Sequence, residues 1–255
     1  MPTIKNKLYF NYGGIWSHVF NLIQITTNTG MFEENFVASR DIVETKTKGS
    51  DEPLFHGIES SPKEFEMEIA FESAFDEDNI YQIIMWLFSD TYKPLFFEGS
   101  EDRVFYCIAV GEPSIIHNGL NQGYFKITMR CNSSNIFSQN IITPNETVND
   151  SKIITIENVG HFTIFPEISI KKIGTGTITI ESLDDFGSIF EVRDLTNQED
   201  IYLDCKKEII KTDIIGVYRY DKVIGEYPRI LCGSNRFKVT GECEIQFRYK
   251  NKYRF

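Results

Sequence analysis

The clearest pattern of hydrophobic and polar positions lies between residues 64 and 72. Large apolar residues alternate there with glutamates, and a period of two is typical of a β-strand with one buried face. We therefore expect a strand whose outer face is wet and strongly acidic. The apolar side carries Phe65, Met67, Ile69 and Phe71, and the other side carries Glu64, Glu66, Glu68 and Glu72, with Ala70 among them.

The period then changes to that of a helix. Three acidic residues at 76–78 suit a helix N-terminus, because they can cap it and complement its dipole. Trp86 lies roughly 140° from the centre of the apolar stripe that follows, at ~100° per residue, so a second side of the helix could also be covered. We predict a helix over Asp78–Phe88, with a stripe of Ile80, Ile83, Ile84, Leu87 and Phe88.

The rest of the first half reads as strands and one long connection. A hairpin turn or loop is expected at Asn11–Gly14, and further strands are expected over 93–98, 103–110 and 125–131. Residues 40–62 are rich in charge, Gly and Pro, which indicates a long polar loop or an extended arm. Long connections in compact domains are more often functional than accidental.

A change of composition divides the chain. Residues 132–152 are rich in Asn, Ser, Thr and Asp, which predicts a linker between two domains. Beyond it, short apolar runs alternate with turns such as Gly174-Thr175-Gly176, the pattern of a β-sandwich. We expect a mainly β chain with one helix, divided into a first domain at 1–140, a linker at 141–152 and a second domain at 153–255.

The amino-acid composition favours strands, and the net charge and cysteine spacing exclude some classes of function. The chain of 255 residues contains 21 Phe and 12 Tyr, which favour strands, and its formal net charge is −11. Most of that charge lies before residue 141, so a nucleic-acid-binding surface is not expected, although an acidic wall would suit DNA that only passes by. The five Cys are widely spaced, which suits reduced thiols in a cytosolic assembly. We expect neither a signal peptide nor a membrane span.

Each candidate for chemistry has a plainer interpretation. The glutamates of the alternating strand could supply paired acids for glycoside hydrolysis, but a solvated strand face gives the same pattern. The four His stand apart from one another, and no phosphate-binding loop or nucleophile elbow is present in the sequence. Tyr218 and Tyr220, beside Gly216 and Arg219, could contact a glycan or a protein partner, although such pairs more often pack at an edge. We expect no catalytic residue, no metal site and no cofactor.

The order of these features resembles the distal tail protein family of long-tailed, siphovirus-type phages. The alternating strand, the capped helix with Trp86-Leu87, and the strands that follow match the family's first half. The runs Asn158-x-Gly160, Pro166-x-Ile168-x-Ile170 and Gly174-x-Gly176-x-Ile178 match its second half. One departure is the family's loop pattern of Arg, six residues and Gly-Arg/Lys-Asp-Gly, because Arg40 is here followed by Lys48-Gly49-Ser50-Asp51.

The resemblance implies a hexameric ring at the tail tip with an open channel. The first domain, similar to a tail-tube sandwich or split barrel with a helix, would build the ring wall, and a galectin-like sandwich would point outward. Implied partners are the tail-tube protein, the tail-tip protein, receptor-binding or baseplate proteins, and DNA in transit, in a virion tail assembled in the host cytoplasm. A heterologous ring contact would use Arg40, Lys46, Lys48, Asp51, Glu52 and Trp86, and the channel would be faced by some of Glu64, Glu66, Glu68 and Glu72.

Several alternatives stay open at this point. The arm could be an ordinary mobile loop, and Trp86 could be buried inside one protomer, which is the interpretation we favour. A lone carbohydrate-binding module, a secreted glycan-cleaving enzyme, and a hub from a contractile tail or bacteriocin particle are the rival functions.

Overall fold

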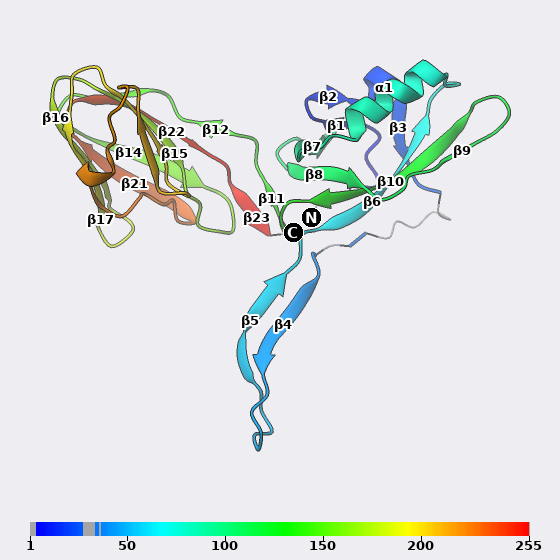
Figure 1. Cartoon of the computed structure of the whole chain (residues 1–255), viewed down its shortest axis with the longest axis horizontal. Coiled ribbons are helices and arrows are strands. Elements are labelled where there is room, and N and C mark those ends of the chain that lie inside the picture. The colour runs from blue at the N-terminus through cyan, green and yellow to red at the C-terminus, as the bar shows by residue number, and fades with distance from the viewer. Residues whose placement is uncertain (1–3, 28–33, 36, 255) are drawn as a thin grey trace. The chain divides into compact units, whose positions relative to one another are not determined.

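The computed structural model describes residues 4–27, 34–35 and 37–254. The chain divides into two compact units, which are Met1–Phe137 with Arg254–Phe255, and Ser138–Tyr253. Each unit is built almost entirely of antiparallel strands (Figure 1). The expected mainly β fold with one α-helix is thereby confirmed for the described residues.

The N-terminal unit contains one curled sheet in which all neighbouring strands run antiparallel. The predicted turn at Asn11–Gly14 joins its first two strands as a hairpin. In spatial order the strands are β2 (Ile15–Trp16), β1 (Phe10–Tyr12), β7 (Lys93–Phe97), β8 (Phe105–Val110), β10 (Gly123–Cys131), β6 (Glu64–Phe71) and β3 (Leu22–Ile25), and β9 (Ile115–His117) pairs with β10.

Strand β6, which lies between β10 and the edge strand β3, is the alternating strand of the sequence. Phe65, Met67 and Ile69 are buried, while Glu64 and Glu66 are exposed on the other side. The buried side chains belong to the core of this unit, so the period of two fixes which face of the sheet is inside.

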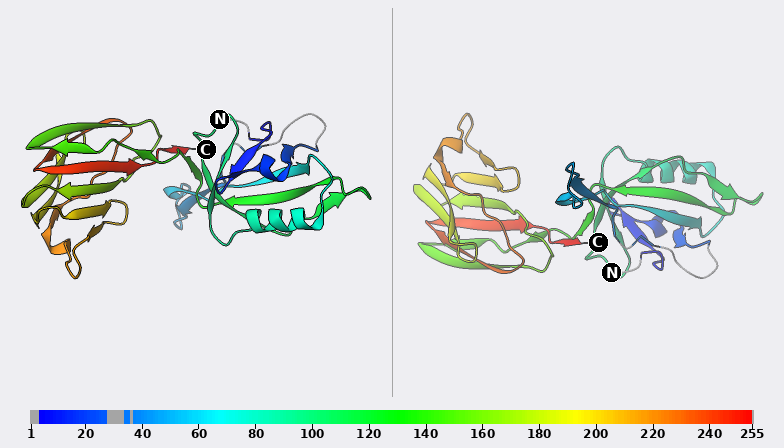
Figure 2. Two further views of the ribbon diagram at one scale, coloured as in Figure 1. Left: turned by 90° about the horizontal axis from the view of Figure 1, so that it is seen from above. Right: turned by 90° about the horizontal axis from the view of Figure 1, so that it is seen from below.

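Helix α1 (Glu77–Leu87) lies across one face of this sheet (Figure 2). Asp76 caps it, since its carboxylate accepts a hydrogen bond of 2.7 Å from the Asn79 N–H. Its buried residues are Ile83, Trp86 and Leu87, whereas Ile84 is 46% exposed. The predicted apolar stripe was therefore wrong in its centre, because the large indole ring, not Ile84, takes the inward position.

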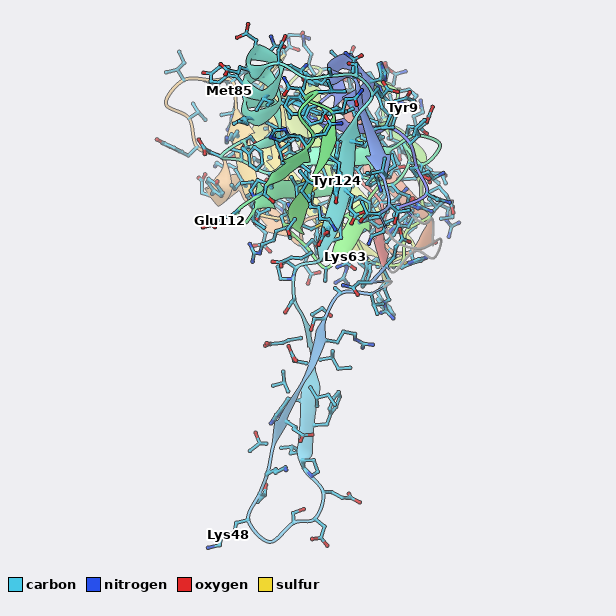
Figure 3. The ribbon with its side chains drawn as sticks, turned by 90° about the vertical axis from the view of Figure 1, so that its right-hand side faces the viewer. Tyr9, Lys48, Lys63, Met85, Glu112 and Tyr124 are labelled. Carbon is cyan, nitrogen blue, oxygen red and sulfur yellow. The ribbon has the colours of Figure 1, made fainter. Side chains whose placement is uncertain are left out.

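Residues 40–62 form an arm, as one of the two expected alternatives proposed. Within the described part of the chain, strands β4 (Arg40–Thr45) and β5 (Leu54–Ser60) pair only with each other, and their residues are exposed apart from the half-buried Gly57. Figure 3 shows this hairpin extending from the N-terminal unit, with Lys48 at its tip and Lys63 at its base.

The C-terminal unit is a β-sandwich of two antiparallel sheets around one hydrophobic core. The first sheet is ordered β12 (Ile141–Ile142), β22 (Cys243–Tyr249), β15 (Glu167–Lys172), β18 (Asp200–Asp204) and β19 (Ile209–Thr212), with β13 (Glu146–Val148) also on β22. The second is ordered β14 (Ser151–Asn158), β21 (Gly233–Thr240), β16 (Gly176–Ser182), β17 (Ser188–Leu195) and β20 (Val223–Gly225). Short elements complete the chain, namely β11 (Asn135–Phe137), β23 (Lys252–Arg254), η1 (Ser17–Phe20) and η2 (Tyr220–Lys222).

The expected linker at 141–152 differs from what the structure shows. Ile141 pairs with Tyr249, and Glu146 to Val148 pair with Ile245 to Cys243, so this segment extends the first sheet. Its polar composition reflects strands at a sheet edge, where one face and one side remain in water.

Candidate assembly surfaces

The acidic face of β6 is half neutralised by two cations from the neighbouring strand β10. Arg130 Nε lies 3.1 Å from Glu64 Oε1. Lys126 Nζ lies 2.5 Å from Glu68 Oε1 and 3.6 Å from Glu66 Oε1. These contacts follow from the antiparallel register, which sets Lys126 opposite Glu68 and Arg130 opposite Glu64. The face that looked purely acidic in sequence is a ladder of paired charges.

Glu68 and Glu72 have further partners. The Thr27 N–H and hydroxyl both donate to the Glu68 carboxylate, at 2.5 and 2.9 Å. Partial burial raises the pKa of Glu68, but the hydrogen bonds from Lys126 and Thr27 outweigh it and hold that pKa below its usual value. Tyr9 donates a hydrogen bond of 3.2 Å to Glu72. These two carboxylates therefore belong to local polar networks within the unit.

The arm carries charge at its tip and apolar side chains along its stem. Among the described residues, no ion pair holds the predicted interface residues Arg40, Lys46, Lys48, Asp51 and Glu52, and all five are exposed. The sequence-based prediction treated residues 40–62 as polar and overlooked the apolar residues of the stem, which are present in the sequence of that segment. Their exposures are 65% for Ile42, 36% for Val43, 61% for Leu54, 60% for Phe55 and 45% for Ile58.

Lys63 fixes the base of the arm. Its ammonium group donates to the Asn35 carbonyl, its N–H donates to Ser133 O at 3.2 Å, and its carbonyl accepts from the Cys131 N–H at 2.8 Å. Desolvation lowers the pKa of this lysine to about 8. The side chain borders a hollow of about 420 Å³ where the arm joins the sheet.

Trp86 is not available to a neighbouring subunit, which corrects its place among the interface candidates. Its Nε1–H donates a 2.8 Å hydrogen bond to Tyr12 O, and its ring stacks on Phe10 and Phe20 with centroid distances of 5.7 and 4.6 Å. It is 6% exposed, so burial within the protomer is the interpretation that the structure supports. The outward face of α1 instead presents Tyr81 and Met85.

Tyr218 and Tyr220 are exposed on a loop that a buried ion pair holds in place. Their exposed fractions are 80% and 53%. Arg219, between them, turns inward and donates two hydrogen bonds of 2.8 Å to the carboxylate of Glu199. Tyr218 is mostly in water, Tyr220 is about half covered, and Ile215 on the same loop is 98% exposed.

A groove of about 550 Å³ crosses the outer face of the first sheet of the sandwich. Sequence reasoning missed it, because its side chains come from four strands that only the register brings together. Tyr202 lies in its floor, where the register sets it opposite Ser169 on one side and Lys211 on the other. The lining residues are Asn145, Ser169, Ile170, Lys171, Asp200, Ile201, Tyr202, Lys211, Thr212, Asp213, Glu244 and Gln246.

The described part of the chain contains no cluster of three or more His, Cys, Asp or Glu side chains placed to hold a metal ion. Within the same residues, no helix has the length and apolar character needed to cross a membrane.

Two family models match the chain along most of its length. A model described as phage tail protein N-terminal domain matches residues 5–133, and one described as phage tail C-terminal domain matches residues 136–249. The SPbeta prophage-derived uncharacterized protein YomH of Bacillus subtilis (strain 168) is 32% identical over 250 residues, which cover 98% of this chain and 99% of that protein.

Two solved structures share the fold. The Dit (gp 19.1) protein of phage SPP1, described as a paradigm of hub adsorption apparatus in phages infecting Gram-positive bacteria, superimposes with a TM-score of 0.68 at 14% identity. That match covers 96% of this chain and 98% of that chain. A chain of the phage P2 baseplate in its activated conformation with Ca gives a TM-score of 0.52 at 9% identity, over 91% of this chain and 90% of that one.

Proposed function

The chain belongs to the phage tail protein family, as its matches to the N-terminal and the C-terminal domain models establish, and from this premise we propose that it is the distal tail protein of a phage. In this role it is a structural, non-enzymatic hub that joins the tail tube to the tail-tip or adsorption apparatus. The fold shared with SPP1 Dit over nearly the whole chain is the observation that carries the proposal. It places the chain in the virion tail, among other tail and baseplate proteins.

The proposed assembly is a hexameric ring in which the arm of one copy lies on the next. An isolated two-stranded hairpin is at best marginally stable in water, yet this one exposes Ile42, Phe55 and Ile58. Contact with a second copy would bury those side chains and bring the charged tip, with Lys46 and Lys48, against the neighbour. A ring contact of this kind is heterologous, because the arm meets a different surface.

A channel for DNA is part of the proposal, with the β6 face as one candidate wall. Glu64 and Glu66 remain exposed and could face passing phosphates, while Glu68 and Glu72 are engaged with neighbouring groups. Because Lys126 and Arg130 neutralise half of this face, its repulsion of DNA would be weaker than four free carboxylates would give.

The test is the oligomeric state of the full chain in solution, measured by light scattering and by electron microscopy of negatively stained particles. We expect rings of six subunits, or pairs of such rings. A variant that lacks residues 46–53 should remain folded by circular dichroism and lose the ring. An unchanged ring in that variant would remove the tip of the arm from the interface and leave only the stem to be tested, and a strict monomer that also fails to join purified tail tubes would contradict the hub.

Host-surface glycan binding is a second candidate function, favoured by the groove around Tyr202. Its planar polar side chains and one aromatic ring are the groups that bind sugar hydroxyls and sugar faces. We propose a glycan array with the full chain, Tyr202→Ala, and the double variant Tyr218→Ala, Tyr220→Ala. Loss of binding in Tyr202→Ala alone would support the groove, loss in the double variant alone would move the site to the loop, and no binding by the parent chain would remove this function.

A further inference from the structure

Cys107 and Cys131 face each other across the two central strands of the N-terminal sheet. Cys107 on β8 is the register partner of Cys131 on β10, and both thiols are free and buried. The Cys131 thiol is close enough to Cys107 to help raise the pKa of the Cys107 thiol. Cys131 lies beside Lys63 at the base of the arm, since its N–H donates to Lys63 O at 2.8 Å, and the proposed hub makes no use of the two thiols.

The backbone hydrogen bonds identify the kind of pair that these residues form. The Asn132 N–H donates to Tyr106 O at 2.8 Å, so Asn132 and Tyr106 form a hydrogen-bonded pair. Hydrogen-bonded and non-hydrogen-bonded pairs alternate along antiparallel strands, so the adjacent pair, Cys131 and Cys107, is a non-hydrogen-bonded one. The Cys131 N–H points the other way, to Lys63 O at 2.8 Å. Pairs of this kind bring their Cα atoms to about 4.5 Å, which is inside the range of about 4.4–6.8 Å that disulfides occupy.

We propose that Cys107 and Cys131 are a latent cross-strand disulfide site that closes when the folded chain meets hydrogen peroxide. One thiol attacks the peroxide, whose O–O bond breaks, and becomes a sulfenic acid as one water leaves. The second thiol then attacks the sulfenic sulfur, the S–S bond forms, and a second water leaves. Two thiols are oxidised and one peroxide is reduced, so atoms and electrons balance.

Burial sets the rate and the choice of oxidant. Desolvation, together with the neighbouring thiol, holds the pKa of Cys107 well above its usual value, so its reactive thiolate is scarce at neutral pH. The site stays reduced during synthesis and assembly, and it closes slowly under an oxidant small enough to enter the sheet. The link would join strands β8 and β10 and close a loop of residues 107–131.

The experiment uses the full chain with Cys232→Ser, because Cys232 is the exposed cysteine and would cross-link molecules. The protein is treated with millimolar hydrogen peroxide at pH 7 and pH 9, alkylated, and digested with trypsin without reduction. We expect a linked pair of peptides, 104–126 with 131–152, which forms faster at pH 9. The thermal midpoint of the N-terminal unit should rise by about 5 °C or more, and a reductant should reverse the rise.

Two controls make the result decisive. Cys131→Ala should give neither the linked peptides nor the rise in thermal midpoint. Cys205 and Cys243 are also buried thiols but are not register partners, so they should stay unlinked under the same treatment. Recovery of peptides 104–126 and 131–152 as separate thiol or sulfinic forms would overturn the proposal, as would a link that appears only after denaturation.

Discussion

Arg219 and Glu199 form a two-point ion pair inside the C-terminal unit, with both N–O distances at 2.8 Å. Their side chains are 9% and 0% exposed. The same carboxylate accepts hydrogen bonds from Thr196 and Thr212, so its oxygens are well satisfied. Burial raises the pKa of Glu199, but these partners, Arg219 first, bring it below its usual value. The pair ties the loop that displays Tyr218 and Tyr220 to the turn before β18.

Removing one partner of this pair should destabilise the C-terminal unit strongly. Arg219→Ala leaves a buried carboxylate without its cation, and such losses cost about 3 kcal/mol in the free energy of unfolding. The measurement is urea denaturation followed by tyrosine fluorescence. Arg236→Ala is the matched control, because its pair with Asp184 lies at the surface, and we expect little change there. Equal effects of the two variants would contradict this prediction.

Trp86→Ala should destabilise the N-terminal unit by about 3–5 kcal/mol, because it leaves a cavity between α1 and β1 and removes the hydrogen bond to Tyr12 O. Ile84→Ala, two residues away on the exposed face of the same helix, should cost much less. Thermal unfolding of both variants checks the difference. A similar loss in both would mean that the helix packs through its Ile84 side after all.

The apolar stem of the arm should matter more to ring formation than its charged tip. Ile42→Ser with Phe55→Ser should abolish the ring while leaving the unfolding midpoint of the subunit nearly unchanged, because both side chains are exposed in the single chain. Lys46→Ser with Lys48→Ser is the control, and we expect that ring to persist with a weaker salt dependence. Light scattering at two salt concentrations gives the readout. Loss of the ring only in the lysine variant would assign the contact to charge.

The sequence predicted local features well where one pattern decides them. The alternation at Phe65, Met67 and Ile69 and the acidic cap at Asp76 are both confirmed, and so is the resemblance to distal tail proteins at the level of the fold. The centre of the helix stripe was wrong because periodicity weighs Ile84 as heavily as Trp86, although the indole fills far more space. The rotation of the helix about its axis is decided by how well each side chain fills the space against the facing strand. The hydrophobic pattern of the helix alone does not contain that information.

Features that depend on register could not be found from the sequence. Lys126 and Glu68 are 58 residues apart, and only the antiparallel pairing of β6 with β10 makes them neighbours. The facing of Cys107 and Cys131 and the groove around Tyr202 arise in the same way. The expected linker failed for a related reason, because the short strands that begin at Ile141 and Glu146 gain stability from β22 rather than from their own composition.

Lys63 makes the stability of the folded chain depend on pH, and its lowered pKa sets the sign of that dependence. The pKa is about 8 in the folded chain, against 10.5 for an unperturbed lysine side chain. Between these values the unfolded chain binds the proton more tightly than the folded chain does, so stability rises with pH across this window. Below pH 8 both states carry the proton, and the cost of the desolvated charge is fully present.

Lys63→Met should therefore change the pH profile as well as the stability. The free energy of unfolding of the parent chain, minus that of the variant, should rise by about 2 kcal/mol between pH 8 and 10.5, after allowance for partial solvent screening. Other groups that titrate in this range are common to both proteins and cancel in the difference. Lys152→Met controls for the change of residue type, because the Lys152 ammonium group is paired with Glu146 at the surface. A flat profile for Lys63→Met would mean that Lys63 keeps an ordinary pKa and that water reaches its ammonium group at the base of the arm.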